Sequence, residues 1–185
     1  MEKVEAENLQ PESKVFQVST QGDVSALAAR LRDSTNLTRR RIQELLESEP
    51  DSMLVLSRLK FEAVGCDPLL PARGLNFVEQ LNQLFTYHAS FQAAAWLLDK
   101  HPNRAPLILN LGTASGTDIE SRDGYLAAEV FAAVDPRNNR KLGNDIARLK
   151  LRDVPLKYVF YLSPTTAGSQ DEFEIGEVSV RRLRL

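Results

Sequence analysis

The sequence is poor in the residues that build disulfides and zinc sites. It contains one cysteine, Cys66, and two histidines, His88 and His101. A single cysteine excludes an internal disulfide framework, and these three residues show no zinc-ligand spacing. We therefore expect a chain that folds without cross-links, in a reducing compartment such as the cytoplasm.

Long apolar runs and a strong net charge are also missing. No stretch of about 18 apolar residues occurs, and no basic segment followed by an apolar one opens the chain. The formal net charge is -2, so a surface that binds nucleic acid must be local. The turn GTASGT at 112–117 lacks the GK[ST] ending of a P-loop. We expect a soluble protein with no membrane partner and no P-loop chemistry.

The composition is that of a globular protein with a substantial core, because 43% of the 185 residues are hydrophobic and 26% are charged. A loop at 66–74, with two prolines and a glycine, divides the chain into residues 1–70 and 71–185. In the first part we predict a strand at 14–20. Helices are predicted there at 24–33, 37–49 and 50–64.

The second part has an α/β pattern. Residues 75–100 predict the longest helix, and 106–134 reads as three short strands joined by tight turns. A helix is then predicted from Asp135-Pro136 to about residue 151, because Asp is a common N-cap and Pro is common at the first helical position. Two strands, 157–163 and 174–184, complete the pattern.

Two acids stand out among the three short strands. Glu129 is the only charged residue in the otherwise apolar stretch 125–134, and Asp118 precedes it by 11 residues. A hairpin turning at Asp123-Gly124 would bring the two carboxylates side by side. A buried acid needs a partner or a function, and paired carboxylates without His or Cys suit Mg²⁺ or Mn²⁺. The sequence therefore predicts a metal site here.

A polar stripe marks the first half of the helix at 75–100. At 100° per residue, five polar side chains fall within about 100° of one another. They are Glu79, Asn82, Gln83, Thr86 and Ser90. On a helix that is otherwise apolar, such a stripe usually faces a cavity, a partner or water.

This order of elements and acids resembles the PD-(D/E)XK nuclease superfamily, which has the restriction-endonuclease-like fold. The resemblance covers about residues 76–163, where Glu79 matches the helical acid, Asp118 the first-motif Asp and Glu129 the acid of the E-X-K motif. It implies an αβββαβ core with a central mixed sheet flanked by helices, preceded here by an N-terminal helical extension. It also implies a Mg²⁺- or Mn²⁺-dependent nuclease acting on DNA in bacterial restriction, repair or defence, often as a homodimer.

The sequence departs from the family pattern at the lysine. Position 131, two residues after Glu129, holds Phe131, whereas the motif has a lysine that stabilises the attacking hydroxide or the charge of the transition state. Some members supply the cation from the following helix, where Lys141 is the candidate and Arg140 the second. Thr117 replaces the proline before Asp118, which is a common variation.

Several alternatives stay open at this point. Glu129 could lie in a buried salt bridge, and Asp118 could cap a turn. Glu79 could be an acid at a helix N-terminus that interacts favourably with the helix dipole. Lys141 could be a solvated lysine. The segment Arg137-Asn138-Asn139-Arg140, at the expected helix start, could hold a phosphate of the nucleic acid. A non-catalytic module that binds nucleic acid or a partner protein on the same fold is the second hypothesis for the whole chain.

Overall fold

The computed structural model describes residues 14–111, 116–135, 140–164 and 171–185. The helices are α1 (Gln21–Ser48), α2 (Ser52–Phe61), α3 (Phe77–Lys100), the 3-10 turn η1 (Pro102–Arg104) and α4 (Lys141–Lys150). The strands are β1 (Val15–Val18), β2 (Gly65–Cys66), β3 (Gly74–Leu75), β4 (Leu107–Asn110), β5 (Ile119–Ser121), β6 (Leu126–Ala132), β7 (Leu156–Leu162), β8 (Glu172–Ile175) and β9 (Val178–Leu183).

Seven of these strands form one mixed sheet in the order β1-β4-β5-β6-β7-β9-β8. Strands β4, β5 and β6 are successive antiparallel neighbours, whereas β6 and β7 are parallel and are connected through α4. The α/β class and the central mixed sheet agree with the expectation from sequence. The N-terminal strand β1 adds to the sheet beside β4, so the segment before α1 is part of the same sheet.

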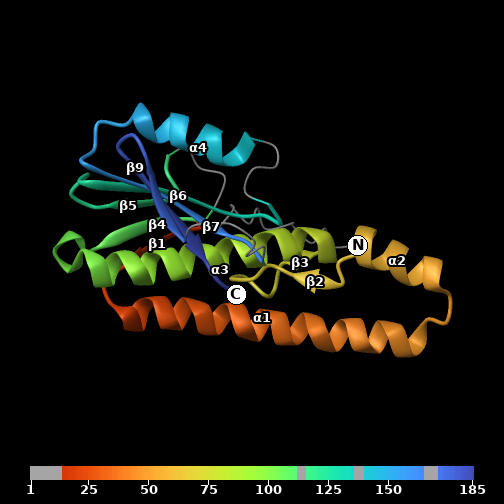
Figure 1. Ribbon diagram of the computed structural model, residues 1–185. Coiled ribbons are helices and arrows are strands. Elements are labelled where there is room, and N and C mark those ends of the chain that lie inside the picture. Colours follow the sequence, from red (N-terminus) through yellow and green to blue (C-terminus); the bar gives the residue numbers. More distant parts are fainter. Residues whose placement is uncertain (1–13, 112–115, 136–139, 165–170) are drawn as a thin grey trace, which may run out of the picture.

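Helices cover both faces of the sheet. Figure 1 shows α4 over one face, with α3 against the other and α1 stacked outside α3. The alternation along β6 explains this arrangement, because Leu126, Ala128 and Val130 enter the buried cluster that includes α1 and α3. Ala127 and Phe131 enter the cluster with α4 instead. Glu129, between them in the same alternation, therefore points to the side of α4.

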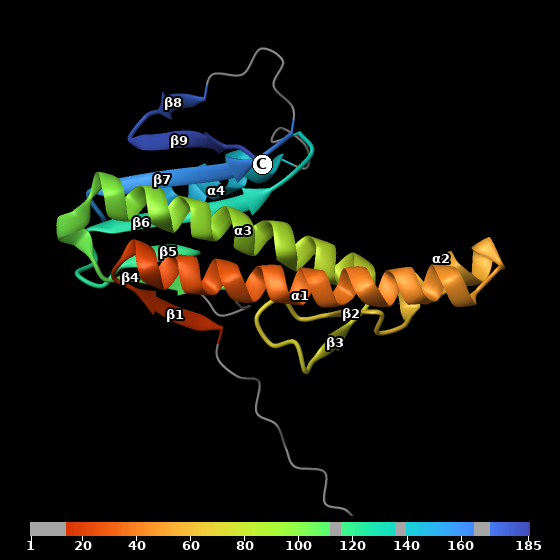
Figure 2. The same ribbon diagram turned by 90° about the horizontal axis from the view of Figure 1, so that it is seen from below.

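Helix α1 is one continuous helix of 28 residues, so the predicted break near residues 34–36 is wrong. Of the three residues that suggested the break, Ser34 is fully buried, and Thr38 one turn later is buried as well. Thr38 donates a hydrogen bond to Gln80 of α3 at 2.6 Å, and the hydroxyl of Ser34 lies 3.5 Å from Cys66 Sγ. Tertiary contacts thus satisfy side chains that favour turns in isolation. Beyond the sheet, α1 and α2 form a projecting arm (Figure 2).

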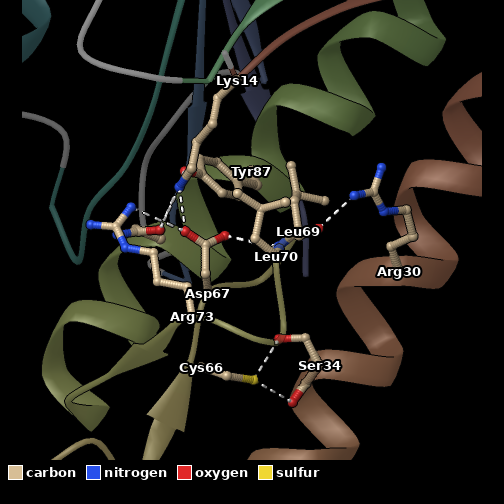
Figure 3. A network of polar contacts seen from close by, with 10 residues as sticks. Lys14, Arg30, Ser34, Cys66, Asp67, Leu69, Leu70, Arg73 and Tyr87 are labelled. Carbon is tan, nitrogen blue, oxygen red and sulfur yellow. Dashed lines mark hydrogen bonds and ion pairs between the residues drawn. The ribbon is translucent and has the colours of Figure 1, made fainter. Parts of the chain in front are cut away.

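The predicted loop at 66–74 is confirmed for residues 67–73, which connect the paired strands β2 and β3, and the first part of this loop is buried. Its centre is Asp67, which is fully buried. Asp67 Oδ2 accepts a hydrogen bond from Lys14 Nζ at 2.6 Å, and Oδ1 accepts from the backbone N–H groups of Leu69 and Leu70 (Figure 3). This network joins the N-terminal strand region to α3, since Lys14 also donates to Tyr87.

Helix α2 and the last predicted strand also differ from the predictions. Helix α2 begins after Asp51, whose side chain accepts from two N–H groups of the first turn, so Pro50 is not its first residue, and α2 ends at Phe61 rather than near residue 64. Helix α4 begins at Lys141, because Arg140 has a left-handed backbone with φ 55°, whereas the predicted first helical residue, Pro136, lies outside the described residues. The last predicted strand is the hairpin β8–β9, which turns at Gly176 with φ 68°. None of the described helices has the length and apolar character that a bilayer crossing requires.

Candidate functional site

The hairpin β5–β6 brings Asp118 and Glu129 together, as the turn at Asp123-Gly124 predicted. Its register pairs Ile119 with Ala128, so one step further Asp118 comes opposite Glu129 on the same side of the sheet. Asp118 is held in place by the backbone, since its Oδ2 accepts a hydrogen bond from the N–H of Val130 at 2.7 Å. The two carboxyl groups are close enough for each to influence the pKa of the other.

Both carboxyl groups have a raised pKa. Burial raises the pKa of Glu129 to about 8, and the neighbouring Asp118 charge adds to the effect. Burial also raises the pKa of Asp118, although its hydrogen bond from Val130 opposes the shift. The side chain of Glu129 is only 3% exposed. At neutral pH the pair therefore holds a proton that a nearby cation would displace.

Helix α4 adds a third acid and two cations. Asp145 is fully buried, and its Oδ1 accepts from Lys141 Nζ at 2.8 Å and from Arg148. Arg148 also reaches Glu129 Oε2 at 3.2 Å. The second oxygen of Asp145, Oδ2, is buried and accepts no hydrogen bond from the described residues. Three acids thus face two cations whose side chains are about half exposed, and the proton on the Asp118–Glu129 pair makes up the difference in charge.

The position of the missing lysine is filled by an aromatic side chain. Phe131 is 5% exposed and stacks on Tyr161, with ring centroids 6.0 Å apart. Lys141 lies near it, with Nζ 5.9 Å from the centre of the Phe131 ring, and its charge lowers the pKa of Asp118. A cation is therefore present beside the carboxylates, although it comes from α4 and not from β6.

An open cleft of about 850 Å³ begins at these residues. Asp118 and Lys141 line one part of it, and the carboxyl ends of β6 and β7 line another. The opposite wall is the first half of α3, through Leu81, Asn82, Phe85 and Thr86. The predicted polar stripe thus faces this cleft through two of its five members, Asn82 and Thr86. The carboxyl ends of parallel strands are where α/β sheets commonly bind ligands.

Of the remaining predicted site residues, Glu79 and Arg140 do not line the cleft, and the other three lie outside the described residues. Glu79 is exposed in the first turn of α3, one turn before the cleft wall, where Asn76 caps its N–H. Arg140 is exposed immediately before α4. Arg137, Asn138 and Asn139 lie outside the described residues.

Asp145 and Arg148 were not predicted as site residues, although the helical period places both beside Lys141 on one flank of α4. The spacing i, i+4 and i+7 from Lys141 was the available signal, since it aligns two cations with one acid. What the sequence could not reveal is that Asp145 is fully buried beside the other two acids.

The donor set fits a hard cation. No group of three or more His, Cys, Asp or Glu side chains that could hold a metal ion occurs in the described part of the chain. Mg²⁺, however, is usually held by one or two carboxylates, with waters completing its octahedron. A pair of adjacent carboxylates with raised pKa, next to an unpartnered carboxylate oxygen, meets that requirement. Comparison with family models, curated proteins and solved structures finds no match for the chain.

Proposed function

We propose that this chain is a Mg²⁺- or Mn²⁺-dependent endonuclease of the PD-(D/E)XK type that hydrolyses phosphodiester bonds of DNA. One observation carries the proposal: Asp118, which lines the cleft, faces the buried Glu129 on the adjacent strand, and a retained proton rather than a further cation neutralises the pair. A purely structural acid pair would be expected to have its full complement of partners. The order α3-β4-β5-β6-α4-β7, with β6 and β7 parallel, supports it.

Asp118 and Glu129 would hold the metal ion. When bound, the ion would polarise a phosphoryl oxygen and lower the pKa of a water for attack on phosphorus. The chain itself orients the ligands, since the Val130 N–H fixes one oxygen of Asp118. Arg148 reduces the net charge around Glu129, and this favours the ionised carboxylate that a metal requires.

Lys141 would supply the cation of the missing motif lysine. Its ammonium lines the same cleft as Asp118, so it can stabilise negative charge on a phosphate bound there. Asp145 holds Lys141 by an ion pair at 2.8 Å, which limits the movement of its ammonium group. A fixed charge costs less reorganisation during the reaction than a mobile one.

The test is cleavage of plasmid and single-stranded DNA in Mg²⁺ or Mn²⁺ by the wild type, Asp118→Asn and Glu129→Gln. Both substitutions should reduce the rate by at least about 100-fold, while chelation abolishes cleavage. Glu120→Gln is the matched control, because Glu120 lies on the same face of the sheet as Asp118 but pairs with Arg152 at the surface. Cleavage that survives both site substitutions would overturn the assignment.

Phe131 favours a second candidate, a module of the same fold that binds nucleic acid without cleaving it. Its ring occupies the lysine position and is packed on Tyr161. In that case no metal-dependent cleavage is expected. Binding should weaken steeply as the salt concentration rises, because phosphate contacts release counterions.

A further inference from the structure

The cleft beside the carboxylates has two chemically different parts. Asp118 and Lys141 are the only charged side chains of the described residues that line it. The rest of the lining is apolar apart from Asn82 and Thr86, and includes Phe85 of α3 and the ends of β6 and β7. A phosphodiester backbone needs cations or N–H donors along its path, so it would not run through the apolar part.

The apolar part has what a nucleobase needs. Phe85 is 39% exposed, so part of its ring is available for stacking. Asn82, one turn earlier on α3, is exposed and carries an amide that can both donate to and accept from the edge of a base. Stacking on an aromatic ring combined with polar contacts to the base edge is the usual mode for unpaired nucleotides. A volume of about 850 Å³ is within the range of small-ligand sites.

We infer that this cleft binds the base of an unpaired nucleotide, stacked on Phe85, while the phosphate of that nucleotide lies at Asp118 and Lys141. This deepens the proposed nuclease function, on which it rests, by defining the substrate class as single-stranded or locally unpaired nucleic acid. In an intact duplex the bases are stacked inside the helix, and a base enters a side cleft only after it is flipped out. The charged end of the cleft and its aromatic wall therefore select an unpaired substrate together.

Binding is measured first, by fluorescence anisotropy of a labelled single-stranded oligonucleotide in EDTA, which prevents metal-dependent cleavage. A second oligonucleotide of the same length has abasic residues in place of nucleosides. The wild type should bind the base-containing strand about 10-fold more tightly than the abasic one, in keeping with the stacking of one base. Phe85→Ala should lose that difference and bind both strands equally.

Three further variants test whether the aromatic ring of Phe85 is responsible. Phe85→Leu keeps an apolar side chain without an aromatic face, and should behave like Phe85→Ala, whereas Phe85→Trp should retain the preference for bases. Phe61→Ala removes a phenylalanine that is 72% exposed on α2, outside the cleft, and should leave both affinities unchanged. Equal affinity of the wild type for the two strands, or Phe85 variants that match Phe61→Ala, would overturn the inference and indicate another occupant of the cleft.

Cleavage separates this inference from the proposed function. With Mg²⁺, a strand or a duplex with one unpaired nucleotide should be cut at least about 10-fold faster than the fully paired duplex. Cleavage that depends on Glu129 but is indifferent to pairing and to Phe85 overturns the inference and keeps the nuclease. Base-dependent binding that requires Phe85, without any cleavage, overturns the nuclease and keeps the base site.

Discussion

Among the described residues, buried acids occur in two places, and their surroundings differ. Asp67, beneath the helical arm, has partners for both oxygens: two backbone N–H groups on Oδ1, and Lys14 at 2.6 Å with Arg73 at 3.7 Å on Oδ2. Glu129, in the sheet, has Arg148 at 3.2 Å and faces two further carboxylates. An acid with a full set of partners joins elements of the fold, whereas an acid that burial and neighbouring carboxylates keep protonated costs stability once it ionises and is expected to serve a function.

The largest stability effect is expected at the satisfied acid. Asp67→Asn turns an amide towards the ammonium of Lys14, and this should lower the free energy of unfolding by about 3 kcal/mol. The melting temperature would then fall by about 6 to 12 °C. Calorimetry or denaturant unfolding measures both quantities.

Glu62→Gln is the matched control for Asp67→Asn. It breaks an ion pair of similar length, Arg58 to Glu62 at 2.9 Å, but both side chains are exposed on α2. Its effect should be below about 0.5 kcal/mol. Equal losses in the two variants would mean that burial of the ion pair does not decide its contribution.

Replacing the carboxylate of Glu129 by an amide should raise the free energy of unfolding, whereas the same change at Asp67 lowers it. The pKa of Glu129 is about 8 in the fold against an ordinary value of 4.5, so the folded state keeps a proton that the unfolded state loses between these values. The free energy of unfolding therefore falls as pH rises through this window. Glu129→Gln should remove the penalty and raise stability by about 2 kcal/mol at pH 8.5, with little effect at pH 4.5.

This pH dependence is best read as the difference between wild type and Glu129→Gln. Burial lowers the pKa of both His88 and His101, so each of them makes the fold more stable as pH rises near 6. That contribution is common to both proteins and cancels. A variant that is less stable than wild type at pH 8.5 would show that the carboxylates are already neutralised in the fold.

The surroundings of Asp67 and of Glu129 also differ in how far the sequence alone could predict them. The pairing of Asp118 with Glu129 follows from local information: an alternating apolar strand, a favoured Asp-Gly turn and an odd charge within it. The contact between Lys14 and Asp67 spans 53 residues, and no local pattern indicates it. Non-local packing also buries Ser34, one of the three polar residues at 34–36 whose pattern predicts a break in α1. The helical period correctly places Asp145 beside Lys141 on one flank of its helix. Its complete burial, however, depends on how α4 packs against the sheet.

A bound metal ion should stabilise the fold through the Asp118–Glu129 pair. Mg²⁺ at ten times its dissociation constant should stabilise the wild type by about 1.4 kcal/mol, because it binds only the folded state. The gain should vanish in Glu129→Gln and persist in Glu120→Gln. Near pH 7 binding should also release up to about one proton, since the carboxyl pair is partly protonated before the ion arrives. Titration calorimetry in two buffers of different ionisation enthalpy measures that proton, and its absence would place the ion elsewhere.

The smallest stability effect, with a large effect on cleavage, is expected at Lys141. Its side chain is 43% exposed and Asp145 keeps a second partner in Arg148, so Lys141→Met should change the free energy of unfolding by less than about 0.5 kcal/mol. Cleavage should nevertheless fall about 100-fold, because the charge facing the phosphate is lost. Lys150→Met, on the exposed end of the same helix, is the control and should leave both quantities unchanged. A larger loss in Arg140→Met than in Lys141→Met would move the role of the missing motif lysine to Arg140, one residue before the helix begins.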